Sequence, residues 1–555
     1  MKTKKYLLLI SIAALASCGN TDFSFVDKSS SGESSTTSEN ASSSVDEPQK
    51  TSSEESKSSS EQSSKEESSS SEEQSVSSSE NEPILNGDGY VTGPLKYKIS
   101  SFSDTYTPNE GDVHVLVVPI DLSTASDASS YNLDTWSDEE IDFIDTQYFG
   151  TGDVGAVIGG PYRYWTFKDY YETTSHGLVK IDGEVSSAYK VSSTTTIEKI
   201  LSDSTMGTLH DVFDAALASI QENNPNIDWS QYDLNNDGLF DSCHFISNYK
   251  GASWGESLWP HQGQTHRSKN NYIVADNYSL SSIEKFKNAQ TCTHEQGHMF
   301  GLEDYYDYSE APDGEETYSF LGSLDMQDSN WFDWNSFSKL VTGWANPTVI
   351  TGEKDSVTVT LSDAATTGDC LLVPAAYSDF NNSPYDEYFL FELFSPKGNN
   401  ELPWTVLEAS SGLGSYGVRA YHVCGKAYGL DNRGYAYELF DKNGYPINGF
   451  ASVASAACNS ATCKDYGGDD DYDDYPLLSL VSKTDPSKYM KRNSTLLSSE
   501  DLWHEGDTFT WDSGKYAIKK GGEAASTMVN GDTFPYEITF DSMSKDSMTV
   551  TISKK

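Results

Sequence analysis

The sequence predicts an α+β fold in which a mixed part of helices and strands precedes a part built mainly of strands. Three observations carry this prediction. The apolar, β-branched run from His114 to Asp121 is typical of a buried strand. Apolar residues recur at helical spacing from Leu209 to Asn223 and predict an amphipathic helix. From Val349 onward, short segments alternate between apolar and polar residues, which indicates a β-rich, sandwich-like structure.

The length of the chain, 555 residues, exceeds what one hydrophobic core usually serves, so two or three domains are expected. We place a mixed domain at residues 86–346 and the β-rich C-terminal region at residues 347–555. Trp331 to Trp344 is predicted as the last helix of the first domain, which Asn346-Pro347 then ends. The strands expected in the second region cover residues 356–361, 388–393, 417–423 and much of 538–552.

Residues 1–18 have the pattern of a bacterial lipoprotein signal peptide. A lysine-rich head precedes the apolar run Tyr6–Ala14, which is too short to span a bilayer. Leu15–Cys18 follows and predicts cleavage before Cys18 and lipidation of its thiol. The chain would then be exported and anchored to the cell membrane with its folded part outside, and plain secretion is the alternative. Because no later apolar run reaches about 18 residues, the lipid anchor is the only membrane contact expected.

Residues 19–85 are predicted to form a disordered tether. Phe23 to Glu82 consists almost entirely of Ser, Glu, Thr, Lys and Gln. So few apolar residues cannot offset the entropy lost on ordering. Behind a lipid anchor, the segment would hold the folded part away from the membrane. A low-complexity segment without a role is the alternative.

The net charge excludes nucleic acid as a partner. The chain has 85 Asp and Glu against 37 Lys and Arg, which gives a formal charge of −48. Such an acidic surface repels the phosphates of DNA and RNA. It also leaves many carboxylates available to bind calcium.

The segment from His294 to Asp304 has the residues of a catalytic zinc site. His294 and His298 stand four residues apart, so on a helix both imidazoles lie on one face and can bind one zinc ion. Glu295 follows the first histidine and is expected to act as general base. Gly301 allows the helix to stop and the chain to turn back. Asp304 is then placed to supply a third ligand, which leaves the fourth position open for water.

The alternative interpretation of this pair of histidines is a surface or helix-capping role. With 10 histidines in the chain, a match to His-Glu-x-x-His arises by chance in roughly one such sequence in a hundred. The extension through Gly301 and Asp304 lowers that chance, and so does Met326 downstream. Met326 fits the methionine-containing turn found below the zinc of metzincins, although taken alone it would be an ordinary core methionine.

The segment from Asp233 to Asp241 resembles the first part of an EF-hand calcium loop. Oxygen-bearing groups recur at every second position, and Gly238 stands at the sharp turn. The last position of a complete loop would be a bidentate Glu, but His244 occupies it. An Asx-rich turn between a helix and a strand is the alternative. The candidate calcium ligands are Asp233, Asn235, Asp237, Leu239 and Asp241.

Cysteine pairing remains open from the sequence. An exported chain can form disulfides, and Cys458 and Cys463 are close enough in sequence for a local bridge. No pair has the Cys-x-x-Cys spacing of a thiolate metal site. The remaining cysteines beyond the signal segment are Cys243, Cys292, Cys370 and Cys424.

Several groups of residues together resemble the immune inhibitor A family of secreted bacterial zinc metallopeptidases. The resemblance covers residues 110–425, and Glu303 departs from it by standing where a proline is expected. The matching segments are Val115–Asp121, Phe167–Tyr171, Ser175–Gly177, Asp233–Asp241, Trp259–His261, His294–Asp304 with Tyr306-Asp307, Asp325-Met326, Lys339–Pro347, Glu387–Glu392 and Gly412–His422.

The resemblance implies a metzincin-like catalytic domain followed by a β-rich region. It maps zinc onto His294 and His298, the general base onto Glu295, and the family's aspartate onto Asp304. We therefore expect a surface-anchored zinc endopeptidase that acts on proteins or peptides. The pattern of Asp233–Asp241 adds calcium as a second expected cofactor. The alternative is a surface-tethered binding or adhesion lipoprotein whose zinc site is structural.

Overall fold

The computed structural model describes residues 87–101, 106–150, 153–154, 164–252, 256–265, 271–275, 277–283, 289–306, 319–410, 413–424, 476–490, 496–511, 516, 528 and 533–555. These residues form a mixed α/β structure, which agrees with the α+β class. The signal segment with Cys18, the proposed tether and the pair Cys458 and Cys463 lie outside the described residues. Within them, no helix is both long and apolar enough to cross a membrane.

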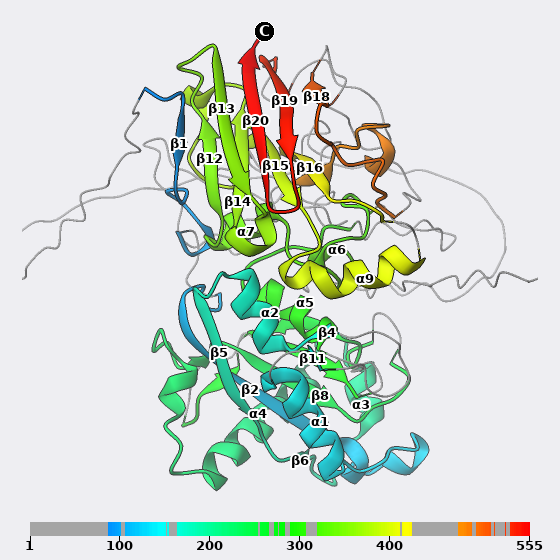
Figure 1. Cartoon of the computed structure of the whole chain (residues 1–555). Coiled ribbons are helices and arrows are strands. Elements are labelled where there is room, and N and C mark those ends of the chain that lie inside the picture. Colours follow the sequence, from blue (N-terminus) through cyan, green and yellow to red (C-terminus); the bar gives the residue numbers. More distant parts are fainter. Residues whose placement is uncertain are drawn as a thin grey trace, which may run out of the picture. The chain divides into compact units, whose positions relative to one another are not determined.

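The first sheet has six strands in the order β5-β2-β8-β11-β9, with β6 also pairing with β2 (Figure 1). Strand β2 pairs in parallel with β5, β6 and β8, and β8 pairs in parallel with β11. Strand β9 runs antiparallel to β11 and lies at the edge of the sheet. The bounds are β2 Gly111–Asp121, β5 Val179–Val185, β6 Tyr189–Lys190, β8 Cys243–Ser247, β9 His261–Gln264 and β11 Asn277–Ser282.

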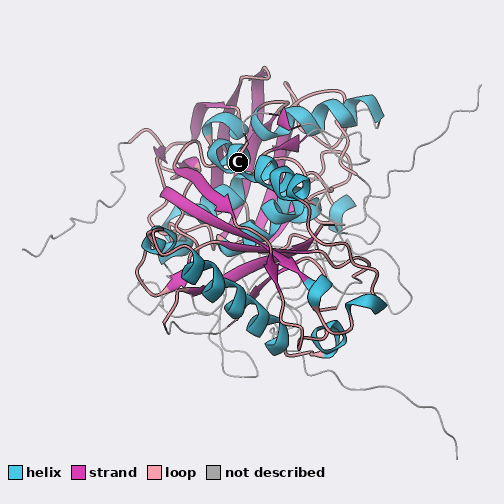
Figure 2. Cartoon of the chain, turned by 90° about the horizontal axis from the view of Figure 1, so that it is seen from below, coloured by secondary structure: helices cyan, strands magenta, loops and turns pink. Residues whose placement is uncertain are grey.

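Helices cover both faces of this sheet (Figure 2). Val113, Val115 and Val117 of β2 pack in one core with α1, α2 and α5, whereas the alternate residues of β2 pack with α3 and α4. The predicted buried strand and the predicted helix near 209–223 are therefore confirmed. Their bounds are α1 Asp138–Phe149, α2 Phe167–Thr174, α3 Ile197–Ser202, α4 Gly207–Asn223 and α5 Gln290–Met299.

Two further sheets share a second core. One has the order β1-β12-β14-β15-β16-β17 and the other the order β13-β20-β19-β18. Phe389 and Phe391 of β15 lie in the same apolar cluster as Phe509 of β18 and Phe540 of β19, so side chains of the two sheets meet face to face. The bounds are β1 Tyr90–Thr92, β12 Asn346–Ile350, β13 Ser356–Ser362, β14 Asp369–Pro374, β15 Glu387–Phe394, β16 Gly417–Cys424, β17 Leu478–Leu480, β18 Thr508–Thr510, β19 Tyr536–Met543 and β20 Ser547–Lys554.

The strands expected in the C-terminal region are confirmed as β13, β15, β16, β19 and β20. Strand β1 comes from the start of the described chain and pairs with β12, far along the sequence. The domain boundary between residues 346 and 347 stays a prediction. Short elements complete the described chain: β3 Asp153–Val154, β4 Tyr164–Trp165, β7 Leu239–Phe240, β10 Val274–Ala275, α6 Met326–Ser329, α7 Ser336–Thr342, α8 Ala364–Thr367 and α9 Glu401–Ser410.

The helix expected from Trp331 to Trp344 is shorter than predicted. Helix α7 covers Ser336–Thr342, because the side chain of Asn335 accepts hydrogen bonds from the first amides and Gly343, at φ 81°, ends the helix. The four described cysteines, Cys243, Cys292, Cys370 and Cys424, are buried free thiols.

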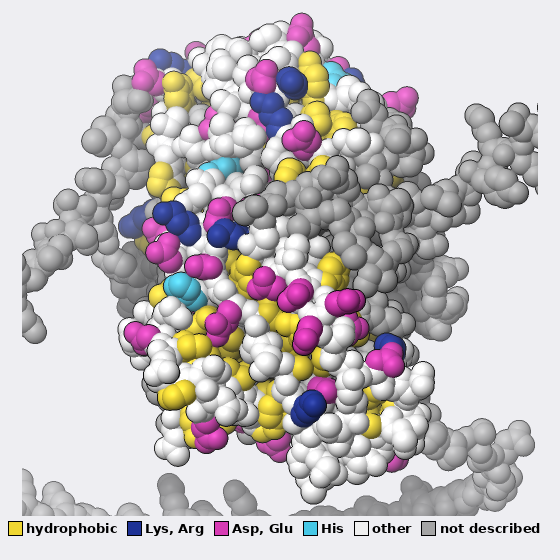
Figure 3. Space-filling model, turned by 60° about the horizontal axis from the view of Figure 1, so that its bottom comes forward, with side chains coloured by type: hydrophobic (Ala, Val, Ile, Leu, Met, Phe, Trp, Pro, Cys, Tyr) yellow, Lys and Arg dark blue, Asp and Glu magenta, His cyan; other side chains and the backbone are white. Residues whose placement is uncertain are grey.

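Acidic side chains are spread over the surface that Figure 3 presents, and Lys and Arg are fewer there. This distribution follows from the composition of the chain, with 85 acidic against 37 basic residues. An anionic face of this kind repels phosphate backbones, and the lack of nucleic-acid binding stays a prediction.

Candidate metal centre

Helix α5 carries both histidines and buries most of its length between the first sheet and the chain that follows. His294 is fully buried, and the side chain of His298 is 11% exposed. The helix ends where predicted: Gly301 has φ 90°, and the amide of Leu302 donates to the carbonyl of Gly297 at 3.0 Å. This turn sends the chain back toward the histidines and brings Asp304 to them.

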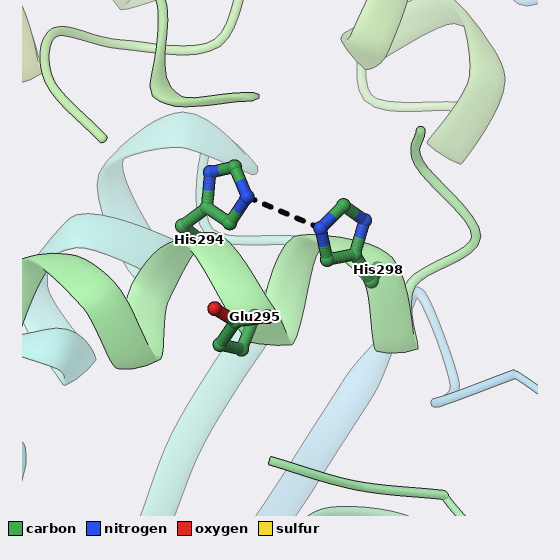
Figure 4. Close-up of side chains that lie close together, drawn as sticks. All are labelled: His294, Glu295 and His298. Carbon is green, nitrogen blue, oxygen red and sulfur yellow. Dashed lines mark hydrogen bonds between the residues drawn. The ribbon is translucent and has the colours of Figure 1, made fainter. Parts of the chain in front are cut away.

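Three side-chain atoms converge beside α5. Nε2 of His294 lies 3.1 Å from Nε2 of His298 (Figure 4). Oδ1 of Asp304 lies 2.8 Å from the first nitrogen and 3.4 Å from the second. Zinc–ligand bonds of about 2.0–2.1 Å in a tetrahedral site separate neighbouring ligand atoms by about 3.3 Å. The three measured separations come near that value, so the residues present fit a zinc ion.

Hydrogen bonds to the chain orient both imidazoles. Nδ1 of His294 donates to the carbonyl of Met326 at 2.7 Å, and Nδ1 of His298 donates to the carbonyl of Leu302 at 2.8 Å. A carbonyl oxygen only accepts, so each Nδ1 carries the proton, and in a neutral ring Nε2 then presents a lone pair. Two lone pairs at this separation require a positive charge between them, from either a proton or a metal ion.

Unpaired oxygens at the site point to the same conclusion. Both carboxylate oxygens of Asp304 and Oε2 of Glu295 are buried without a hydrogen-bond partner. The 2.8 Å approach of Asp304 to His294 is thus a contact of charge rather than a directed hydrogen bond. Buried carboxylate oxygens without partners cost free energy unless a cation compensates them. A bound metal ion would satisfy Asp304.

Protonation of the metal-free site follows from these contacts. Burial lowers the pKa of His298, but the carboxylate of Asp304 outweighs burial and raises it to about 10. Burial raises the pKa of Asp304, but His298 and His294 hold it below its usual value. Asp304 is therefore the anionic member of the cluster, and the positive charge lies on His298. A divalent cation would replace that proton.

Glu295 follows His294 on α5, and its carboxylate is not one of the three closely converging atoms. His294, Glu295 and His298 form a group whose candidate ligand atoms lie within 4.8 Å of one another. Asp304 approaches both imidazole nitrogens to within 3.4 Å, so it is better placed than Glu295 to be a third ligand of an ion held by the histidines. Burial raises the pKa of Glu295 to about 7 although His294 and His298 lower it. A carboxylate with a pKa near neutrality suits proton transfer.

Met326 enters the site through its backbone. Its side chain is fully buried, and its carbonyl accepts the hydrogen bond from His294. Asp325 caps the turn: its Oδ1 accepts from the amide of Gln327, and its Oδ2 accepts from the amide and side chain of Asn335. The predicted turn thus lies against the first histidine.

Sequence reasoning named the segments Glu387–Glu392 and Gly412–His422 but gave no role to the residues in them that support this turn from the second sheet. Nη1 of Arg419, on β16, donates to the carbonyl of Leu324 at 2.9 Å. Arg419 also pairs with Glu392 of β15 through Nε at 2.6 Å, and Glu392 accepts from the amide of Ser336 at 2.7 Å. All of these groups are buried. These residues reach the site through contacts between segments that are far apart in the sequence, and no local motif predicts such contacts.

The sequence also offered no reason to single out Gln327. Its position beside Gly297 predicts how a substitution at Gly297 changes stability. Nε2 of Gln327 donates to the carbonyl of His294 at 3.2 Å, and a Cβ at Gly297 would lie 2.2 Å from its Oε1. We expect Gly297→Ala to displace buried Gln327 and lower the free energy of unfolding by about 1–3 kcal/mol, although alanine is the better helix former.

The matched control for this prediction is Gly207→Ala, at the start of α4, where a Cβ would approach no heavy atom closer than 3.4 Å. This change should leave stability unchanged or raise it by up to about 1 kcal/mol. Urea unfolding of the two variants measures the difference. Equal stabilities would contradict the role given to Gln327.

The candidate calcium loop folds as a tight turn between the short 3-10 helix Trp229–Tyr232 and β7. Gly238 has φ 91°, as the sharp turn requires. Three carboxylates belong to it, those of Asp233, Asp237 and Asp241. Burial and the charges of Asp237 and Asp233 raise the pKa of Asp241 to about 6, although the hydrogen bond from the amide of Leu234 lowers it. Among the described residues, no three side chains of this loop bring their carboxylate oxygens within 4.8 Å of one another. The loop carboxylates therefore lie further apart, and Asn235 and the carbonyl of Leu239 remain candidate donors.

Comparison of the chain with protein-family models and with curated protein sequences found no match. The case for a metal centre accordingly depends on the geometry around α5. His294, His298, Asp304, Glu295 and Met326 were all named from the sequence, and the fold brings them together.

Proposed function

We propose that the chain is a zinc-dependent endopeptidase that hydrolyses peptide bonds of extracellular proteins, anchored to the bacterial membrane through Cys18. The observation that carries the proposal is the convergence of His294, His298 and Asp304, with Glu295 beside them. Three protein ligands leave one position for water or substrate, the arrangement of catalytic zinc sites. The metzincin-like fold and the likeness to the immune inhibitor A family belong to this proposal.

Each residue of the site has a chemical role in this proposal. His294, His298 and Asp304 would hold the zinc ion, which supplies a Lewis acid for the scissile carbonyl and for the attacking water. Glu295 takes the proton from the water at its unpaired Oε2 and gives it to the leaving amine. Met326 orients His294 through its carbonyl and is not a ligand.

The position of the edge strand β9 favours a peptide as the substrate. The backbone of β9 comes near the site, because the amide of Gln262 lies close enough to the carboxylate of Glu295 to lower the pKa of that group. Among the described residues β9 pairs only with β11, and no described strand pairs with its outer edge. Main-chain hydrogen bonds along such an edge bind a peptide independently of its side chains. A substrate held there would pass beside Glu295.

Removal of zinc tests the proposal. We expect the purified protein to cleave casein, to lose cleavage after treatment with a chelator, and to regain it when zinc is restored. A peptide hydroxamate should bind the zinc-loaded protein, because hydroxamates need an open metal position. A folded, zinc-loaded protein that neither cleaves casein nor binds hydroxamate would favour the alternative of a binding lipoprotein with a structural zinc site.

A further inference from the structure

The loop Asp233–Asp241 contains a buried oxygen that has no partner. Asp233 is 4% exposed; its Oδ2 accepts from the amide of Gly238 at 2.9 Å, and its Oδ1 is buried without a hydrogen bond. An ionised oxygen in this position is costly unless a cation or donor meets it. The loop supplies further oxygens at the alternate positions that calcium loops use. Oδ1 of Asp233 is therefore available as a ligand atom for a cation.

The last residue of this loop is connected to the zinc helix. The hydroxyl of Thr107 donates to the carbonyl of Asp241 at 2.6 Å and accepts from Nε2 of Gln296 at 3.1 Å. Gln296 lies on α5 between the two histidines. The amide of Thr107 also donates to the carbonyl of Met299 at 2.8 Å, so Thr107 holds the end of α5 as well.

A second branch of the same network runs from the strand that follows the loop. Oε1 of Gln296 accepts from the hydroxyl of Ser242 at 2.7 Å and from Nε2 of His244 at 2.8 Å. Burial lowers the pKa of His244 to about 4, so its ring is neutral. Nδ1 of His244 then accepts from Tyr148, at 2.9 Å, and from Ser279, at 2.8 Å. Buried networks that are satisfied in this way fix one orientation of the groups they join.

We propose that the loop Asp233–Asp241 binds a calcium ion, and that this ion holds the zinc helix in its binding geometry through Asp241, Thr107 and Gln296. The inference deepens the proposed function and depends on it. Without the ion, the three carboxylates of the loop repel one another and the carbonyl of Asp241 loses its fixed position. Thr107 then no longer anchors Gln296, and the two imidazoles lose the alignment that zinc requires. Calcium accordingly tightens zinc binding.

The calcium site is tested with calcium itself, by calorimetric titration of the full-length protein. We expect Asp233→Asn to bind one ion fewer than the wild type, and Asp237→Asn, at an exposed position, to give the same loss if Asp233→Asn misfolds. Glu139→Gln, an exposed carboxylate on α1, is the control and should bind as the wild type does. Unchanged stoichiometry in both loop variants would overturn the site.

The coupling is tested by zinc affinity, measured by competition with a chromogenic chelator in the presence and absence of calcium. Calcium should tighten zinc binding by about 5- to 20-fold in the wild type. Thr107→Val should bind calcium normally but lose this response. Thr124→Val removes a comparable hydroxyl, which donates to the carbonyl of Val191 at 2.7 Å away from α5, and should keep it.

These readouts separate the inference from the proposed function. A wild type whose zinc affinity ignores calcium, or a Thr107→Val variant that still responds, would overturn the coupling. A protein that shows the coupling but does not cleave casein would overturn the peptidase and leave the calcium site in place.

Discussion

Glu295→Gln is expected to lower peptide hydrolysis by about 100- to 10,000-fold while leaving the fold and the bound zinc intact. The amide has the shape of the carboxylate but cannot take a proton from water. The three atoms that converge on the metal position belong to His294, His298 and Asp304. Because Glu295 supplies none of them, the variant should bind as many zinc ions per chain as the wild type. Cleavage rate, zinc content and the unfolding midpoint are the three measurements.

The control for this variant is Glu303→Gln, which changes a carboxylate in the turn next to Asp304 but outside the converging atoms. It should retain most of the activity. Zinc-loaded Glu295→Gln protein with wild-type cleavage would remove Glu295 from the mechanism. Loss of zinc together with activity would instead make Glu295 part of the ligand set.

Arg419→Met is expected to lower the free energy of unfolding by about 3–5 kcal/mol, because it leaves the carboxylate of Glu392 buried without its cationic partner. The two side chains are 3% and 1% exposed and their nitrogen and oxygen lie 2.5 Å apart. The variant also removes the hydrogen bond to the carbonyl of Leu324, two residues before Met326. Urea unfolding measures the loss, and zinc affinity should fall with it.

Two further variants show whether charge is the cause. Adding Glu392→Gln to Arg419→Met removes the unpaired charge and should recover at least about 1 kcal/mol. Lys483→Met breaks a partly exposed pair with Asp507 and should cost no more than about 1 kcal/mol. Arg419→Met and Lys483→Met proteins of equal stability would contradict the role of the buried pair.

The sequence alone determined the features that depend on neighbouring residues. Spacing placed His294 and His298 on one helical face, and Gly301 marked the end of the helix because few other residues adopt its positive φ. Apolar periodicity predicted β2 and α4, since a strand buried on both faces and an amphipathic helix have distinct patterns. The length predicted for the helix near 331–344 was wrong, because the cap at Asn335 and the turn at Gly343 were overlooked.

The tertiary structure decided everything that depends on residues far apart in the chain. It brought Asp304 within 3.4 Å of both imidazole nitrogens and gave His294 the carbonyl of Met326 as an acceptor. It placed Arg419 of the second sheet against the turn before Met326. Local patterns report which face of an element is apolar, but they carry no information on which distant group meets a buried polar atom. At this site that pairing sets the orientation of both histidines and the charge beside them.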